Sequence, residues 1–218
     1  MRAKNKKMID SFRSLEELRS KSAKTKNSLF QLTIGNRIPR DYFWTYGTGE
    51  SDITIHAGSF HLALKKADIE CYNIMSYSSI MPGIAKEIEK PKSYVHGAVL
   101  EAITAVANSP RGERATAGII LGWLYNKKTN EKYGGLVCEY HGSFAEEEAK
   151  ESLGESLGEL YINGFDEEYD LRDIRVVTTS LIPEKIFGTA LVAIGFTSYA
   201  IPVVEISDNS KISKELDT

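Results

Sequence analysis

The sequence predicts an α+β protein in which β-sheets pack on one another and helices cover the outside. Two observations lead to this class. Segments rich in β-branched, aromatic and other apolar residues follow one another along the chain, separated by short polar or glycine-containing stretches. Only a few segments place apolar residues three and four positions apart, as a helix with one buried face does. Runs of strands with a few helices are typical of the α+β class.

Composition narrows the class of protein further. Hydrophobic residues make up 42% of the 218 residues, enough for a packed core, and the formal net charge of -3 gives no reason to expect a nucleic-acid partner. No apolar run approaches the roughly 20 residues of a membrane-spanning helix, so we expect no membrane partner. Cys71 and Cys138 form neither a disulfide framework nor a metal motif. We therefore predict a cytoplasmic protein without a metal centre.

The two ends of the chain differ from its centre. Residues 1–27 hold nine Lys and Arg side chains against three acidic ones, and we predict a basic, flexible extension. A targeting or surface-binding segment is the alternative, although there is no secretory signal. No linker or internal repeat divides residues 28–204, which we predict to be a single domain, and residues 205–218 are predicted to be a polar tail.

The first half of the predicted domain contains strands, a glycine-rich loop and a helix. Leu29–Ile34 and Tyr42–Tyr46 are predicted strands with a turn at residues 36–40 between them. Gly47–Asp52 is predicted to be a loop because its two glycines tolerate unusual backbone angles, but it lacks the lysine and spacing of a phosphate loop. Ala57, Phe60, Leu64 and Ala67 then have helical spacing.

A strand from Tyr72 to Pro82 follows, with Ser78 and Ser79 near its end, and a loop is predicted at residues 83–92. Residues 95–107 fit either a strand of small residues or a helix, and Gly97 and Val99 favour the strand. Residues 116–125 and 134–140 flank a polar turn and are predicted to form a hairpin. The longest helix is predicted over residues 144–161, with Gly164 as its C-cap, and two more strands are predicted at residues 174–182 and 186–201.

Adjacent serines are by themselves ordinary loop chemistry. Six segments in order nevertheless resemble a known family: Gly47-Thr48-Gly49-Glu50-Ser51, the helix with Phe60 and Leu64, Tyr72-Asn73-Ile74, Ser78-Ser79-Ile80-Met81-Pro82, Cys138-Glu139-Tyr140-His141-Gly142 and Phe187-Gly188-Thr189-Ala190. From about Phe30 to Phe196 they resemble the pyruvoyl-dependent arginine decarboxylases. Residues 96–101 further resemble the chlamydial branch, associated with arginine-driven acid resistance; within them His96 and Glu101 are interpreted as structural support or a subunit contact.

The resemblance implies a four-layer αββα sandwich of mostly antiparallel sheets and a chain made as an inactive proenzyme. The chain is then expected to cut itself between Ser78 and Ser79 into β and α chains, leaving a covalent pyruvoyl cofactor at Ser79. Serine supplies the oxygen that this chemistry needs on the β-carbon, and an amide donor is needed for the tetrahedral oxyanion. Asn73 resembles the family's active-site asparagine; the alternative is a strand-end asparagine bonded to nearby backbone.

The implied reaction is decarboxylation of arginine to agmatine and CO2 through a Schiff base to the pyruvoyl group, which is an electron sink. Glu139 resembles the glutamate proposed to return the proton, the alternative being a solvent-facing strand residue. The remaining expected substrate contacts are Tyr72, Phe60, His61, Leu64, Gly47 and Gly49. His61 departs from the family, which has an aspartate there that helps hold the guanidinium. Either another acid binds the guanidinium, with Asp52, Asp68 and Glu70 as candidates, or the substrate is another amino acid.

The resemblance also implies a homotrimer or hexamer with active sites between protomers, and a role in acid resistance or in polyamine biosynthesis. Two other functions stay open. The chain could be an uncleaved, inactive homologue that acts as a structural or regulatory subunit. It could also be a binding module that uses its basic N-terminal residues for interaction.

Overall fold

The computed structural model describes residues 30–92 and 95–208, so the predicted basic extension lies outside the described residues. The chain divides into two compact units, which are treated separately: residues 37–200, and the residues before and after them. In the smaller unit β1 (Phe30–Ile34) pairs antiparallel with β11 (Val203–Asp208). Residues 205–208, predicted to belong to a polar tail, therefore form the end of a strand.

The larger unit holds a five-stranded sheet. Its order is β3-β6-β10-β2-β5, with β2 (Ile38–Ser51), β3 (Asn73–Ser76), β5 (Lys86–Glu87), β6 (Val99–Pro110) and β10 (Phe187–Ala200). The central strand β10 is antiparallel to both neighbours, whereas the short strands β3 and β5 add in parallel at the edges. The helical segment that precedes β3 runs through the π-helical turn η1 (Ile55–Phe60) into α2 (His61–Lys66), as the spacing of its apolar residues predicts.

The same unit holds a four-stranded antiparallel sheet. Its order is β4-β8-β7-β9, with β4 (Ile80–Pro82), β7 (Ala115–Asn126), β8 (Lys132–Gly142) and β9 (Tyr169–Leu181). Strands β7 and β8 form the predicted hairpin. The long helix α3 (Glu146–Gly164) follows β8, and its first turn holds three glutamates that favour the positive end of the helix dipole.

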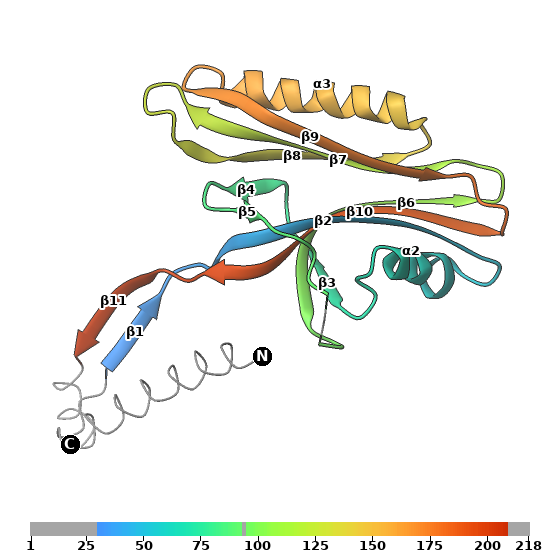
Figure 1. The fold of residues 1–218 in the computed structure, drawn as a ribbon, viewed down its shortest axis with the longest axis horizontal. Helices are drawn as coiled ribbons and strands as arrows, with labels where there is room; N and C mark the ends of the chain where they lie inside the picture. Colours follow the sequence, from blue (N-terminus) through green and yellow to red (C-terminus); the bar gives the residue numbers. More distant parts are fainter. Residues whose placement is uncertain (1–29, 93–94, 209–218) are drawn as a thin grey trace, which may run out of the picture. The chain divides into compact units, whose positions relative to one another are not determined.

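Apolar packing joins these elements in three clusters. One cluster combines residues of both sheets, including Ile103, Ile119 and Val192, so the sheets pack on each other. A second lies between α2 and the five-stranded sheet, and a third between α3 and the four-stranded sheet. Figure 1 shows α3 along one sheet and α2 beside the other. Because β10 is buried on both faces, its residues 189–196 are almost continuously apolar rather than alternating. The predicted α+β class and mostly antiparallel pairing are confirmed.

The predicted loop at Gly47–Asp52 is wrong, because Gly47 to Ser51 belong to β2 and pair with β10. The glycines serve helix packing. A Cβ atom added at Gly47 would lie 2.2 Å from the carbonyl oxygen of Ala63, and one at Gly49 would lie 2.2 Å from that of Ser59. The helical segment therefore lies directly on the backbone of β2, which only residues without a side chain permit.

Smaller differences concern element ends. Residues 38–40, predicted to be a turn, already belong to β2, and the predicted loop after Pro82 contains the two-residue strand β5. Gly164 is the last helical residue of α3 rather than its C-cap, and Phe165 takes the cap position with a φ of -136°. No left-handed cap is formed there, so the helix end does not need the conformational freedom of glycine.

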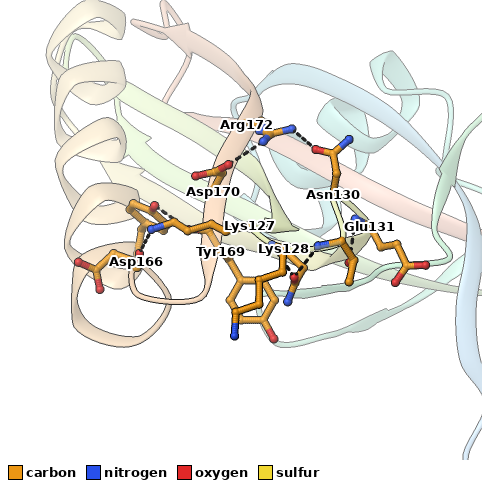
Figure 2. A network of polar contacts seen from close by, with 11 residues as sticks. Lys127, Lys128, Asn130, Glu131, Asp166, Tyr169, Asp170 and Arg172 are labelled. Atoms are coloured by element: carbon orange, nitrogen blue, oxygen red, sulfur yellow. Dashed lines mark hydrogen bonds and ion pairs between the residues drawn. The ribbon is translucent and has the colours of Figure 1, made fainter.

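The turn between β7 and β8 is fixed by polar contacts. Asn126 Oδ1 accepts hydrogen bonds from the backbone N–H groups of Lys128 and Thr129, which closes the turn locally. Figure 2 shows the Arg172 guanidinium between Asn130 Oδ1, 2.7 Å away, and Asp170 Oδ2, 2.6 Å away. This network ties the end of the hairpin to the beginning of β9.

Candidate active site

The predicted single strand from Tyr72 to Pro82 is wrong, because this segment forms two short strands, β3 and β4, that belong to different sheets. Ser78 and Ser79 lie in the connection between them. The backbone N–H of Tyr77 donates to the Ala102 carbonyl of β6 at 2.8 Å, so the chain is still bound to the five-stranded sheet one residue before Ser78. On the other side the carbonyl of Ser79 accepts from the Val137 N–H of β8 at 3.1 Å. The Ser78–Ser79 peptide bond is therefore the crossing point from one sheet to the other.

The side chains of Ser79 and Glu139 are in direct contact. The Ser79 hydroxyl donates to Glu139 Oε1 at 2.6 Å and lies 2.8 Å from Oε2. Glu139 stands on β8 near the place where that strand pairs with β4, and both residues are half-buried. Such short bonds to a carboxylate are the strong, charge-assisted kind. The carboxylate is thus placed to accept the proton of the Ser79 hydroxyl.

The carbonyl oxygen of Ser78 also has a donor. It accepts a hydrogen bond of 2.9 Å from the backbone N–H of Ile80, two residues further on, which is the pattern of a γ-turn centred on Ser79. A nucleophile that adds to this carbonyl would place negative charge on the same oxygen. The Ile80 N–H is therefore positioned as an oxyanion donor.

Asn73, which is predicted to orient groups for cleavage or for the substrate, contacts other backbone groups than the Ser78 carbonyl. Its Nδ2 donates to the Gly97 carbonyl at 2.8 Å, and its own N–H donates to the Ala98 carbonyl. It precedes Ser78 by five residues of mostly extended chain, about 16 Å at the rise of a strand. Within one chain, therefore, the structure does not bring Asn73 to the Ser78 carbonyl. It shows the alternative arrangement, in which a strand-end asparagine bonds to nearby backbone.

Asn73 instead lines a pocket of about 320 Å³ beside α2. Three of the predicted substrate-binding residues, Phe60, Leu64 and Tyr72, line the same pocket. Burial, and next the charge of Asp68, raise the pKa of the Tyr72 hydroxyl, so it is a neutral hydrogen-bonding group at the edge of this pocket. The remaining lining is Ile74, Ser76, Thr104, Val106 and Leu191.

The other predicted substrate contacts are placed differently. His61 is exposed on α2 and is not among the residues that line this pocket. Gly47 and Gly49 are buried beneath the helical segment, where they face backbone atoms rather than an open cavity. Their role in this chain is therefore packing of the helix that supplies Phe60 and Leu64.

Beside the Ser78–Ser79 bond the structure adds Tyr77 and Arg37, which sequence reasoning missed, and gives Glu101, predicted to be structural support or a subunit contact, two partners within the chain. The Tyr77 hydroxyl donates to Glu101 Oε2 at 2.6 Å, and Arg37 forms an ion pair with the same carboxylate. Glu101 is only 3% exposed. One signal was available: strand alternation puts this glutamate on the same face as Ile103, and a charge among core residues needs a partner.

Fold and site together define a class of protein: an α+β unit of two packed sheets in which a serine hydroxyl contacts a carboxylate where the chain passes from one sheet to the other. The family model described as pyruvoyl-dependent arginine decarboxylase matches residues 41–201. The chain belongs to this family.

Individual relatives agree with the family model. The pyruvoyl-dependent arginine decarboxylase AaxB of Chlamydia abortus is 30% identical over 188 residues, covering 77% of this chain and 95% of the relative. Its namesake from Chlamydia trachomatis serovar L2 is 31% identical over 195 residues, covering 79% and 99%. The pyruvoyl-dependent arginine decarboxylase of Thermoplasma volcanium is 31% identical over 160 residues, covering 66% and 85%.

Proposed function

We propose that this protein is a self-processing pyruvoyl-dependent decarboxylase that converts arginine to agmatine and CO2. The observation that carries the proposal is the Ser79 hydroxyl held 2.6 Å from Glu139 Oε1 beside the Ser78–Ser79 peptide bond. Family membership supplies the reaction class, and this contact supplies the groups that the first step needs.

Self-cleavage begins at the Ser79 hydroxyl. Glu139 accepts its proton while Oγ adds to the Ser78 carbonyl carbon, and the Ile80 N–H stabilises the resulting oxyanion. The C–N bond breaks as the amine takes a proton, which leaves an ester. Loss of the Ser79 α-proton then expels Ser78 as a free carboxylate, and water replaces the α-nitrogen, which leaves as ammonia. Ser79 becomes the pyruvoyl end of the second chain.

The residues present fit that group, because Ser79 has the β-oxygen that must leave and a carboxylate beside it. The pyruvoyl group supplies a ketone that withdraws electrons from the substrate as carbon dioxide departs. Glu139 remains next to this position on the rigid strand β8. A carboxyl group there can hold a proton on Oε1 or Oε2 and deliver it to the carbon from which carbon dioxide has left.

We also propose that the active site is completed between protomers of a homotrimer or a pair of trimers. The supporting observation is the separation of its parts within one chain. Ser79 and Glu139 lie at the sheet crossing, whereas Asn73, Tyr72, Phe60 and Leu64 line a pocket to which neither of them contributes. A neighbouring subunit can bring the pocket of one chain to the Ser79 of another.

The three apolar clusters likewise support the four-layer αββα arrangement.

One observation favours a second candidate, decarboxylation of an amino acid other than arginine. Every residue that lines the pocket is neutral, so within the described part of one chain no carboxylate there can bind a guanidinium. His61, where the family has an aspartate, is exposed and lies outside the lining. For arginine, the acid must come from a second subunit or from a residue beyond this pocket.

We place the reaction in the cytoplasm, with the unpaired state of Cys71 and Cys138 as the supporting observation. No helix among the described residues has the length and apolar character needed to cross a membrane. Because decarboxylation uses a proton and produces agmatine, the reaction suits acid resistance or polyamine supply.

Intact mass spectrometry of the purified full chain tests the proposal. We expect fragments of residues 1–78 and 79–218, the second lighter by one ammonia than a fragment that begins with serine. Ser79→Ala should stay uncut. Carbon dioxide release from arginine, lysine and ornithine then identifies the substrate. A wild-type chain that stays whole after long incubation would refute self-processing and favour an inactive homologue or a binding module, to be sought by co-purification and by deleting residues 1–27.

A further inference from the structure

Tyr77, the residue before the candidate scissile pair, is anchored through both its main chain and its side chain. Its N–H bonds to Ala102, and its hydroxyl donates to Glu101 Oε2 at 2.6 Å. Its ring packs against Phe196 with the centroids 5.5 Å apart. Since β3 ends at Ser76, these contacts extend the hold of the five-stranded sheet to the very edge of the Ser78–Ser79 bond.

Glu101 is unusual for a residue of the inter-sheet core. It is 3% exposed and lies on the face of β6 that carries Ile103 into the core between the sheets, so its charge requires compensation. Arg37 provides an ion pair, and its guanidinium also lies over the ring of Tyr199, 5.3 Å from the centroid. Burial, followed by the influence of Tyr77, raises the pKa of Tyr199 to about 12, so this ring is neutral. The Glu101 carboxylate therefore binds the Arg37 guanidinium through Oε1 and accepts the hydrogen bond of the Tyr77 hydroxyl through Oε2.

The downstream side of the bond is anchored as well. The Ser79 carbonyl is bound by Val137, and Ile80 begins β4, which pairs with β8 at Leu136. The segment between the anchors comprises Ser78 and Ser79. Attack of the Ser79 hydroxyl on the Ser78 carbonyl depends steeply on their relative placement, and freedom at either end reduces the time spent in the reactive arrangement.

We propose that Glu101, acting through the Tyr77 hydroxyl, is a positioning residue for self-cleavage between Ser78 and Ser79. This inference rests on the proposed function. Glu101 does not touch the reacting atoms; it fixes the upstream end of the segment that reacts. This positioning role also explains why a buried charge stands at residue 101, where a hydrophobic residue would pack at no desolvation cost.

The test follows self-cleavage of freshly translated full-length chain on denaturing gels. Tyr77→Phe keeps the ring and removes the donor to Glu101. We expect about 10- to 100-fold slower cleavage, the effect of losing one hydrogen bond to a charged group in the reactive arrangement. Tyr125→Phe is the matched control, because its hydroxyl donates to Asp173 Oδ2 at 2.8 Å, away from the serine pair. This control should cleave at the wild-type rate.

A second pair of variants separates positioning from stability. Glu101→Gln keeps an acceptor for the Tyr77 hydroxyl, whereas Glu101→Leu removes it and fills similar space. Arg37 tolerates the loss because its side chain is 54% exposed and stays hydrated. We expect the glutamine variant to cleave faster than the leucine variant at equal thermal unfolding midpoints. Rates within twofold of wild type for both Tyr77→Phe and Glu101→Leu would overturn the inference, whereas a wild-type chain that never cleaves overturns the proposed function itself.

Discussion

Replacement of Glu139 by glutamine is the most direct perturbation of the proposed site. In the structure the Ser79 hydroxyl lies 2.6 and 2.8 Å from the two carboxylate oxygens, so one proton faces both. Glutamine has nearly the same shape and keeps one oxygen as an acceptor. Its amide cannot take up a proton at neutral pH, so the substitution removes proton acceptance and retains the contact.

The expected magnitude follows from that distinction. A positioned general base contributes about 100- to 10,000-fold to a rate, which corresponds to roughly 3–5 kcal/mol of barrier. The oxyanion donor, Ile80 N–H, and the anchors on both sheets are unchanged by the substitution. We therefore expect Glu139→Gln to cleave slowly at a rate in this range, and to remain folded, because the side chain is half-buried and loses a charge rather than volume.

The assay is a time course of cleavage of newly translated chain, with the thermal midpoint measured in parallel. Glu146→Gln is the control, since Glu146 Oε2 also accepts a hydroxyl hydrogen bond, from Thr178 at 2.7 Å, on the far side of the four-stranded sheet. It should cleave like the wild type. A Glu139→Gln chain that cleaves at the wild-type rate would refute the assignment of Glu139 as the base for cleavage.

Three other predictions concern packing, a thiol and the substrate. Gly49→Ala would place a Cβ atom 2.2 Å from the Ser59 carbonyl oxygen, and we expect it to lower the free energy of unfolding in urea by about 1–3 kcal/mol or more. Gly154→Ala, on an open face of α3, should instead raise it by about 1 kcal/mol, and equal effects would contradict the close packing of the helix on β2. Burial, and next the charge of Glu139, raises the pKa of the Cys138 thiol to about 11. Alkylation of Cys138 by iodoacetamide in the native protein should therefore accelerate as the pH rises from 8 toward 11. A rate that levels off below pH 9 would contradict this environment of the thiol. His61 lies outside the pocket lining of one chain, so His61→Asp acts on the substrate only through the proposed subunit interface. There we expect kcat/KM for arginine to rise about 10-fold relative to ornithine, because a carboxylate can bind the guanidinium. An unchanged ratio would show that this position does not reach the substrate.

The elements that sequence predicted well are those with strong local patterns. The β7–β8 hairpin has two apolar runs around a polar turn. In α3 the apolar residues recur every three or four positions, and Ala149, Leu153 and Leu157 form its buried face. The errors occur where distant contacts override local preference. Gly47 and Gly49 read as a loop, yet they are strand residues because a helical segment packs against their backbone. The glycines are the only trace of this contact within the strand, and by themselves they fit a loop equally well.

By itself the sequence determined the family, from the order of its motifs, and the chemical groups of the proposed site, which are the β-oxygen of Ser79 and the carboxylate of Glu139. Only the tertiary structure decided which groups meet. Ser79 and Glu139 are 60 residues apart and touch because β4 pairs with β8 in one particular register, which depends on packing of the whole sheet. The same packing turns Asn73 toward Gly97 and places the buried Glu101 against Tyr77. Local sequence preference contains no information about such pairings, since they arise from burial of residues far apart along the chain.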